Sequence, residues 1–537
     1  MPNKYAALVI GPVYKTILQA RSTRELWAAS YFFSAFMREI LLAANKANIG
    51  TLLSPALIAE TEHIHGAGIY PDRAFWKIKK EDAADQFPDI INRSITSLQK
   101  KLGIPAQIIR DYIQFSVVQL DETTGEDIIL QLNKLLDTAE LYEKTSSHNI
   151  DLPEELENNI QLLYDDGHQN WRTGPHIFLN YQCNSFSFKR LPSIIELSTR
   201  DLENASKPNT YKELVTTPIS EKICELITKN RKRYQRVKAE EEQETLLMEE
   251  IKKQYGDDFK LRHKYIAFVY ADGDNMGTCL KAIGNDEEKL KNFSEALSRF
   301  SVNAAEIIVN YGGIPVFIGG DDLLFALPLV NSGENAGAAG RNLYSLIQKL
   351  DAVFPVEKLR ELSGNKKVET SISYGISIGY YKYPMADMIE MAHQKLYEIK
   401  KSKLKNRLGF EVRKHSGQLF GTILPKGPCL DFFITDFFEK NRDFNDAGFL
   451  ASTIHKFKQV RILYMDAMQN NCLDAFYTNH LNEKIHHRIR SQEDNFLESV
   501  RNFSALLYTT YNNAEAAFES LYACLRVFQF LNQPDHV

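Results

Sequence analysis

The sequence predicts a mixed α+β fold, and three observations support this class. Apolar or alternating runs typical of strands occur at residues 4–10 and several times between residues 262 and 413. In the second region these runs alternate with stretches in which apolar residues recur at the three–four spacing of a helix. Most of the remaining chain has helical spacing only. At 537 residues, several domains are expected rather than one.

The composition is that of an ordinary globular protein, with 44% hydrophobic residues, 25% charged residues and a net charge of −5. A mildly acidic chain is not expected to coat nucleic acids indiscriminately. No apolar run approaches the roughly 20 residues of a membrane span, and the N-terminus predicts a strand rather than a signal peptide. The six cysteines include no CxxC pair, which favours a reducing, cytoplasmic setting without structural zinc.

The region from 262 to 413 has the most regular pattern. Its order of strand, helix, hairpin, helix and strand is that of a ferredoxin-like domain. The predicted elements are a strand at 265–271, a helix at 286–309, a hairpin of strands at 314–317 and 323–327, a helix at 334–354, a strand at 370–378, a helix at 384–401 and a short strand at 409–412.

The flanking regions complete the predicted organisation. A strand at 4–10, closed by Gly11-Pro12, and a long helix at 24–44 indicate a small α+β domain at the N-terminus. We therefore divide the chain into an N-terminal α+β domain at 1–110, a mainly helical domain at 111–261, the central domain at 262–413 and a C-terminal helical bundle at 414–537.

Three aspartates are the candidate catalytic residues. Asp321 and Asp322 follow Gly319-Gly320 at the turn of the central hairpin, and Asp272 follows the first central strand. In a ferredoxin-like sheet this strand lies beside the hairpin, so the three carboxylates are expected at one edge. Neighbouring carboxylates repel, so either one takes up a proton or both bind a cation. Oxygen ligands of this kind suit Mg²⁺ or Mn²⁺.

Such a site suits the attack of a hydroxyl on the α-phosphate of a nucleoside triphosphate. The two glycines leave the turn without side chains, so a bulky anion can approach the backbone. Residues 395–407 then carry six basic residues against one acid, Glu398. Most of these charges are typical of a helix C-terminus, where they offset the helix dipole.

Several segments of the chain resemble one known family. Residues 271–277 (Ala-Asp-Gly-Asp-Asn-Met-Gly), 319–322 (Gly-Gly-Asp-Asp) and 392–400 resemble the cyclase palm domain of the large subunit of type III CRISPR effector complexes. Diguanylate cyclases share this palm more distantly. The segments similar to the Cmr, or type III-B, branch of the family are 11–13, 20–30, 191–193, 196–197 and 415–417.

The resemblance implies two ferredoxin-like palm domains facing each other, with helical domains between and after them. It implies a nucleotidyltransferase that target RNA activates and that makes cyclic oligoadenylate from ATP with Mg²⁺ or Mn²⁺. It also implies a cytoplasmic ribonucleoprotein with RAMP backbone subunits, small helical subunits, guide crRNA and target RNA, and no membrane. On this chain the metal ligands would be Asp272, Asp321 and Asp322, and the nucleotide contacts would be Gly273, Asp274, Asn275, Gly319, Gly320 and Lys400.

Two features depart from the family pattern. Many members begin with a nuclease domain marked by a His-Asp pair, but none of the 13 histidines here precedes an aspartate, so we expect no DNA cleavage. Many members also carry a four-cysteine zinc ribbon before the Pro-Ser segment. Only Cys183 lies near that place, so we expect no zinc.

Other functions fit parts of the pattern. The same donor site could join AMP to another acceptor, such as S-adenosylmethionine, and Asp72 and Glu62 are then candidates to meet its cationic group, although a surface position is more typical of such acids. A catalytically inactive scaffold and a free-standing diguanylate cyclase are further alternatives. The intact aspartates argue against the first, and the N-terminal segment and helical tail argue against the second.

Overall fold

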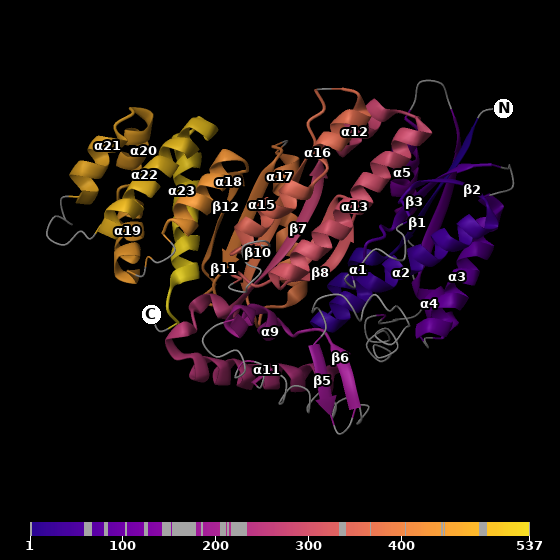
Figure 1. Ribbon diagram of the computed structural model, residues 1–537, viewed down its shortest axis with the longest axis horizontal. Coiled ribbons are helices and arrows are strands. Elements are labelled where there is room, and N and C mark those ends of the chain that lie inside the picture. Colours follow the sequence, from indigo (N-terminus) through magenta and orange to yellow (C-terminus); the bar gives the residue numbers. More distant parts are fainter. Residues whose placement is uncertain are drawn as a thin grey trace.

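The computed structural model contains two large β-sheets with helices packed on them (Figure 1). Besides a few single residues between these ranges, the structure describes residues 3–57, 67–79, 84–102, 105–122, 127–141, 179–183, 186–204, 233–331, 340–365, 367–402, 404–441, 446–482 and 491–535.

The first sheet has the order β2-β3-β1-β4, with every neighbouring pair antiparallel. Strand β1 lies inside this sheet, and its apolar run is buried on both faces, as expected of an inner strand covered by helices. The strands are β1 (Lys4–Gly11), β2 (Gly50–Ser54), β3 (Arg73–Ile78) and β4 (Gln114–Asp121), and the accompanying helices are α1 (Val13–Leu18), α2 (Thr23–Ala47), α3 (Phe87–Leu102), α4 (Ala106–Tyr112) and α5 (Ile128–Glu140).

The second sheet has the order β12-β11-β10-β7-β9-β8. Strand β7 is central and pairs with β10 on one side and β9 on the other. The strands are β7 (Tyr265–Asp274), β8 (Ile314–Gly319), β9 (Asp322–Leu327), β10 (Ser371–Tyr380), β11 (Arg407–Arg413) and β12 (Leu419–Pro425), and the helices are α12 (Met276–Ile283), α13 (Glu287–Tyr311), α15 (Leu343–Val353), α16 (Val356–Ser363) and α17 (Met385–Lys401).

The first four strands of the two sheets lie in the same order. If the strands of each sheet are numbered along the chain, the spatial order of the first four is second, third, first, fourth in both sheets. In each domain helices follow the first strand, and further helices precede the fourth. The predicted order of strand, helix, hairpin, helix and strand is thus confirmed for the central domain.

Helix α13 shows how local sequence sets these elements. The Asp286 side chain accepts a hydrogen bond from the Lys289 amide (3.1 Å) and caps the helix, and Gly312, at φ 102°, ends it in the left-handed region. One face, which includes Leu290, Phe300 and Ile308, is buried. This stripe packs α13 on β8 of its own domain and on β2 of the first.

The two α+β domains pack against each other through corresponding elements (Figure 1). Helix α2 of the first domain contacts β8 of the second, as α13 of the second contacts β2 of the first. A backbone hydrogen bond from the Ile318 amide to the Gly68 carbonyl (2.8 Å) joins them directly. This contact holds the start of the acidic hairpin turn against the first domain.

Helices occupy much of the remaining described chain. Along the chain, the strands of the first sheet are followed by a short hairpin and helices before the second sheet begins. These include β5 (Leu179–Cys183), β6 (Phe186–Arg190), α9 (Ile194–Ser198) and α11 (Arg233–Tyr255). After β12 the elements within the described residues are helices, as predicted. The helices there are α18 (Pro428–Phe432), α19 (Ala447–Gln459), α20 (Arg461–Gln469), α21 (Leu473–Phe476), α22 (Ser491–Tyr511) and α23 (Ala514–Asn532), with π-helical turns at Phe433–Glu439 and Tyr477–Asn482.

Two of the predicted domain boundaries are wrong. Strand β4 pairs with β1 along its whole length, so the first α+β domain extends past residue 110. Strand β12 pairs with β11, so the central sheet extends past residue 413. In both cases an edge strand follows the boundary that the local pattern indicated.

Helix α2 also differs from expectation. Among the described helices it alone is long and apolar enough to cross a membrane by length and composition, although the sequence pattern predicted no stretch of that kind. Of its most apolar window, 67% is buried inside the protein. That burial is typical of a core helix.

Candidate active site

The end of β7 and the β8–β9 turn lie side by side, as the sequence predicted. Strand β7 pairs with β9 up to Ala271 and Leu323, and Gly319 pairs with Asp322 across the turn. Gly320 has a φ of 76°, which only glycine adopts readily. Its amide donates to the Ser301 hydroxyl of α13 (2.8 Å). The turn is therefore anchored to α13 and presents its acidic residues beside the end of β7.

Gly273 allows the closest approach between the two segments. A Cβ atom at this position would lie 2.4 Å from Oδ2 of Asp321 and 2.6 Å from Cγ of Met276. Such distances are far below van der Waals contact. The missing side chain lets the Asp321 carboxylate lie against the β7 backbone.

Replacing Gly273 with valine is expected to displace Asp321 and to lower nucleotide turnover by about a hundredfold, since a misplacement of about 1 Å costs that much. Steady-state assays of product formation measure this effect. Gly448→Val is the control, because that exposed glycine has no positive φ and a Cβ there would meet nothing closer than 3.4 Å. Equal losses in both variants would contradict the assigned role of Gly273.

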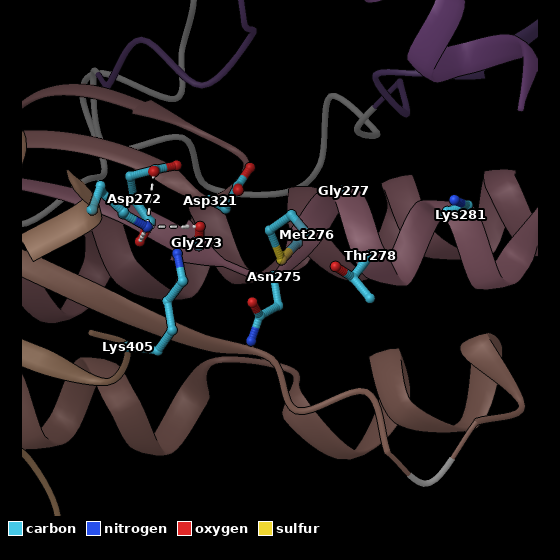
Figure 2. Close-up of a pocket in the computed structure, with 10 residues that line it drawn as sticks. Asp272, Gly273, Asn275, Met276, Gly277, Thr278, Lys281, Asp321 and Lys405 are labelled. Atoms are coloured by element: carbon cyan, nitrogen blue, oxygen red, sulfur yellow. Dashed lines mark hydrogen bonds and ion pairs between the residues drawn. The ribbon is translucent and has the colours of Figure 1, made fainter. Parts of the chain in front are cut away.

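A cavity of about 480 Å³ opens beside these residues (Figure 2). Of the predicted site residues, Asp272, Gly273, Asn275, Asp321 and Lys400 line it. The other four predicted residues, Asp274, Gly319, Gly320 and Asp322, are not among its lining.

Five lining residues were missed by the sequence reasoning: Met276, Gly277, Thr278, Lys281 and Lys405. Asn275, Thr278 and Lys281 are spaced by three residues at the start of α12, so they share one helix face. Figure 2 shows this row leading away from Asp272 and Asp321 toward Lys281. The spacing could have been read from the sequence, whereas the part played by Lys405 depends on the tertiary fold.

Lys400, at the C-terminal end of α17, binds the end of β7 through several oxygens. Its Nζ lies 2.9 Å from Oδ2 of Asp272 and 2.9 Å from Oδ1 of Asp274. It also donates to the backbone carbonyls of Asp272 (2.9 Å) and Gly273 (2.8 Å). Because Asp272 and Asp274 are two residues apart on a strand, both carboxylates project from the same face toward this ammonium.

Asp274 is fully buried, with 0% of its surface exposed. Its Oδ2 accepts hydrogen bonds from the hydroxyls of Ser371 (2.7 Å) and Ser373 (2.7 Å) and from the Asn406 amide (2.9 Å), while Oδ1 accepts from Lys400. Burial raises the pKa of Asp274, but the charge of Lys400 and these hydrogen bonds outweigh it and leave the pKa lowered. Asp274 is thus an ionised internal anchor and not part of the cavity wall.

The hairpin carboxylates have the opposite electrostatics. Burial, followed by the charge of Asp272, raises the pKa of Asp321 from 3.8 to about 6. Burial and the charges of Asp272 and Asp321 raise the pKa of Asp322 well above its usual value. Oδ1 of Asp322 is buried and has no hydrogen-bond partner. A cation would relieve both the repulsion and the missing hydrogen bond.

The oxygen donors at this site are of the kind that a hard divalent cation prefers. The three aspartates do not, however, converge into one ligand group as the sequence predicted. Within the described ranges, no group of three or more His, Cys, Asp or Glu side chains is close enough to hold a metal ion. Available donors are the carboxylates of Asp272, Asp321 and Asp322 and the carbonyl of Gly273, all of them oxygens. The ammonium of Lys400 contacts two of these donors, Asp272 and the Gly273 carbonyl.

These pKa shifts predict a pH-dependent instability of the metal-free chain. A carboxyl whose pKa is raised on folding stabilises the fold when protonated, and this stability is lost as pH rises from about 4 through about 6 for Asp321. Asp321→Asn is therefore expected to raise the melting temperature above pH 6 and to leave it unchanged near pH 4. Thermal unfolding in a chelating buffer measures the difference, and a gain that does not depend on pH would contradict the shift.

Comparisons with known proteins identify the class of this fold and site. The carboxylates of Asp272, Asp321 and Asp322 are called the acidic edge below. Residues 265–409, which contain this edge and the cavity, match the family described as Cas10/Cmr2, second palm domain. Residues 5–103 match the family described as CRISPR-associated protein Cmr2, N-terminal. The chain is therefore a palm-domain protein of the CRISPR systems. Two segments of the chain thus match models of the Cas10/Cmr2 family, as the resemblance predicted.

Individual relatives agree with this family. The Cmr subunit Cmr2 of Pyrococcus furiosus is 26% identical over 186 residues, which are 30% of this chain and only 20% of the relative. A type III-B Cmr-beta structure in the apo state is 12% identical and covers 86% of this chain and 75% of its own, with a TM-score of 0.52. The structure of Csm1 of T. onnurineus is 11% identical, and the match covers 99% of this chain and 70% of Csm1, with a TM-score of 0.51. These two structures show a shared fold.

Proposed function

We propose that the chain is a nucleotidyltransferase that joins ATP molecules into cyclic oligoadenylate, by attack of a 3′-hydroxyl on an α-phosphate. The observation that carries this proposal is the juxtaposition of Asp272 and Asp321 on the wall of one cavity. Burial and the charge of Asp272 raise the pKa of Asp321, and such an acidic pair beside a glycine-lined wall suits a metal-bound triphosphate. The strand order of both sheets supports the ferredoxin-like palm interpretation.

The residues of the chain would divide the work as follows. Asp272, Asp321 and Asp322 would hold Mg²⁺ or Mn²⁺, which when bound supplies Lewis-acid activation of the hydroxyl and neutralises the leaving pyrophosphate. Gly273 leaves room for a phosphate at the backbone, and the first amides of α12 point their N–H groups toward the cavity end of the helix. Lys281, Lys400 and Lys405 supply positive charge along the same wall.

The second nucleotide is proposed to bind between the two α+β domains. The shared order of their first four strands and their reciprocal packing bring corresponding elements of the two domains together. The subunit is further proposed to work in a cytoplasmic assembly with RAMP backbone subunits, small helical subunits, guide crRNA and target RNA. The support for an assembly is the family resemblance together with the shared fold of the type III-B Cmr-beta structure.

Mass spectrometry of the products formed by the assembled complex from labelled ATP tests the activity. We expect cyclic oligoadenylate with target RNA present and none without it. Products that form from GTP without RNA would instead favour a diguanylate cyclase. Absence of any product, with folded protein and bound RNA, would favour an inactive scaffold.

Transfer of AMP to S-adenosylmethionine is a second candidate, and one observation favours it. Burial, against the opposing charge of Arg73, raises the pKa of Asp72 to about 6, and the charge of Asp72 in turn raises the pKa of Asp322. An acid of the first domain therefore faces the acidic edge of the second. A cationic acceptor would neutralise it. Glu62, the other candidate, lies outside the described residues.

Asp72→Asn is expected to lower AMP transfer to S-adenosylmethionine by about tenfold or more, because the acceptor loses a charge-assisted contact, while ATP-only products remain. Product ratios in reactions containing both substrates measure this effect. The control is Asp89→Asn, an exposed acid in the first turn of α3. A product ratio that Asp72→Asn leaves unchanged would exclude Asp72 from acceptor binding.

A further inference from the structure

The ammonium of Lys400 is surrounded by oxygen atoms in a way that resembles the binding of a cation. Four oxygens lie 2.8–2.9 Å from its Nζ: the Asp272 and Asp274 carboxylates and the backbone carbonyls of Asp272 and Gly273. A lysine ammonium has three hydrogens to donate. All three are engaged by these oxygens, so this lysine forms a fixed contact and does not sample solvent freely.

Two of these oxygen sources are also candidate metal donors. The Asp272 carboxylate and the Gly273 carbonyl border the cavity, and Asp321 lies against Gly273 from the hairpin side. A divalent ion bound to them would sit within a few ångströms of the ammonium, and like charges at that separation repel strongly where water is partly excluded. Lys400 and a divalent ion therefore compete for Asp272.

The structure also provides a place to which Lys400 can move. Its side chain lines the cavity and is 20% exposed, and Asp272 is 43% exposed, so the contact between them is on the cavity side. The second contact, with the buried Asp274, holds the lysine close to the site even when Asp272 is released. A small rotation of the side chain would bring the ammonium to an anion in the cavity.

We propose that Lys400 is the resident counter-cation of the acidic site. It excludes free divalent cations from Asp272 and releases that carboxylate when the phosphates of a nucleotide enter the cavity and attract the ammonium. Metal and nucleotide then bind together and not one after the other. This inference rests on the proposed function and adds to the family resemblance, which assigned Lys400 to the triphosphate alone.

The test is a titration of the full chain with Mn²⁺, in which electron paramagnetic resonance measures the bound metal. No nucleotide is converted in this measurement. Lys400→Met keeps the side-chain length and removes the charge, and it is expected to raise the affinity for free Mn²⁺ by about tenfold, the usual range of coupling between two sites. Lys395→Met is the matched control on the same helix, because Lys395 pairs with Glu398 (2.7 Å) and not with the acidic edge. Unchanged or weaker Mn²⁺ binding in folded Lys400→Met would overturn the proposal.

A measurement on the unaltered chain protects the test against a variant that fails to fold. A non-hydrolysable ATP analogue is expected to raise the affinity of the chain for Mn²⁺ by about tenfold, after correction for the Mn²⁺ that the analogue binds in solution. Adenosine, which has no phosphates, is expected to have no effect. Equal Mn²⁺ affinity with and without the analogue would overturn the proposal.

Adding Asp272→Asn to Lys400→Met separates the proposal from the proposed function. If the extra Mn²⁺ binding disappears, the metal lies at the acidic edge, and both the counter-cation role of Lys400 and the proposed function are supported. If the extra binding persists without Asp272, the metal lies elsewhere, and the proposed function loses its site as well as its counter-cation. If Lys400→Met gains no binding while Asp272→Asn alone abolishes Mn²⁺–nucleotide binding, the proposed function stands and the counter-cation role is wrong.

Discussion

Replacing Asp321 and Asp322 together with asparagine is expected to lower nucleotide product formation by at least about a thousandfold, because the acidic edge loses the charge that holds a divalent cation. Asparagine keeps the shape of aspartate. The fold should therefore survive, and the metal-free variant should be more stable than the natural chain at neutral pH, since burial and mutual repulsion disfavour both carboxylates.

The measurements are product mass spectrometry and thermal unfolding of the same preparations. The control is Asp257→Asn with Asp258→Asn, a neighbouring pair of aspartates that is exposed and lies before β7. This pair should retain full activity. Residual activity above about one per cent in the hairpin variant would contradict a metal role for its carboxylates.

Replacing Asp274 with alanine is expected to destabilise the chain by about 3 kcal/mol, the lower end of the cost of removing one partner of a buried ion pair. The loss leaves the Ser371 and Ser373 hydroxyls and the Asn406 amide without their acceptor and takes one of two carboxylates from Lys400. Because Asp272 would then supply the remaining carboxylate that holds Lys400, activity should fall as well.

Denaturant unfolding measures this change, with Asp274→Asn as the comparison. The amide keeps an acceptor oxygen for the serines but not the charge for Lys400, so its cost should be smaller than that of alanine. A cost below about 1 kcal/mol for the alanine variant would show that Asp274 is not the anchor described.

The sequence predicted elements correctly where the residues of one segment are enough to specify its strand or turn. The run at 265–271 and the diglycine turn were predicted as strand and hairpin, and both are present as β7 and β8–β9. Strand β12 was missed because its sequence is only partly apolar, and its fit depends on a distant partner. A Cβ at Gly421 would lie 2.0 Å from the Phe410 carbonyl of β11, a constraint that the local sequence does not reveal.

The candidate site shows the same limit. Asp272 and Asp321 were predicted to converge from strand order alone, and they line one cavity. The pairing of Lys400 with Asp272 and Asp274 could not be predicted, because it joins residues 126 positions or more apart through the packing of α17 on β7. Asp274 was assigned to the nucleotide by its place in the motif, whereas its burial follows from the serines of β10 opposite it.

The most direct test of the account is anomalous diffraction from crystals of the full chain grown with Mn²⁺ and a non-hydrolysable ATP analogue. The proposed site predicts a manganese peak between Asp272 and the β8–β9 turn, with the phosphates of the analogue against Gly273 and the start of α12. Manganese and nucleotide bound together at another place, with Asp272 still paired to Lys400, would contradict it.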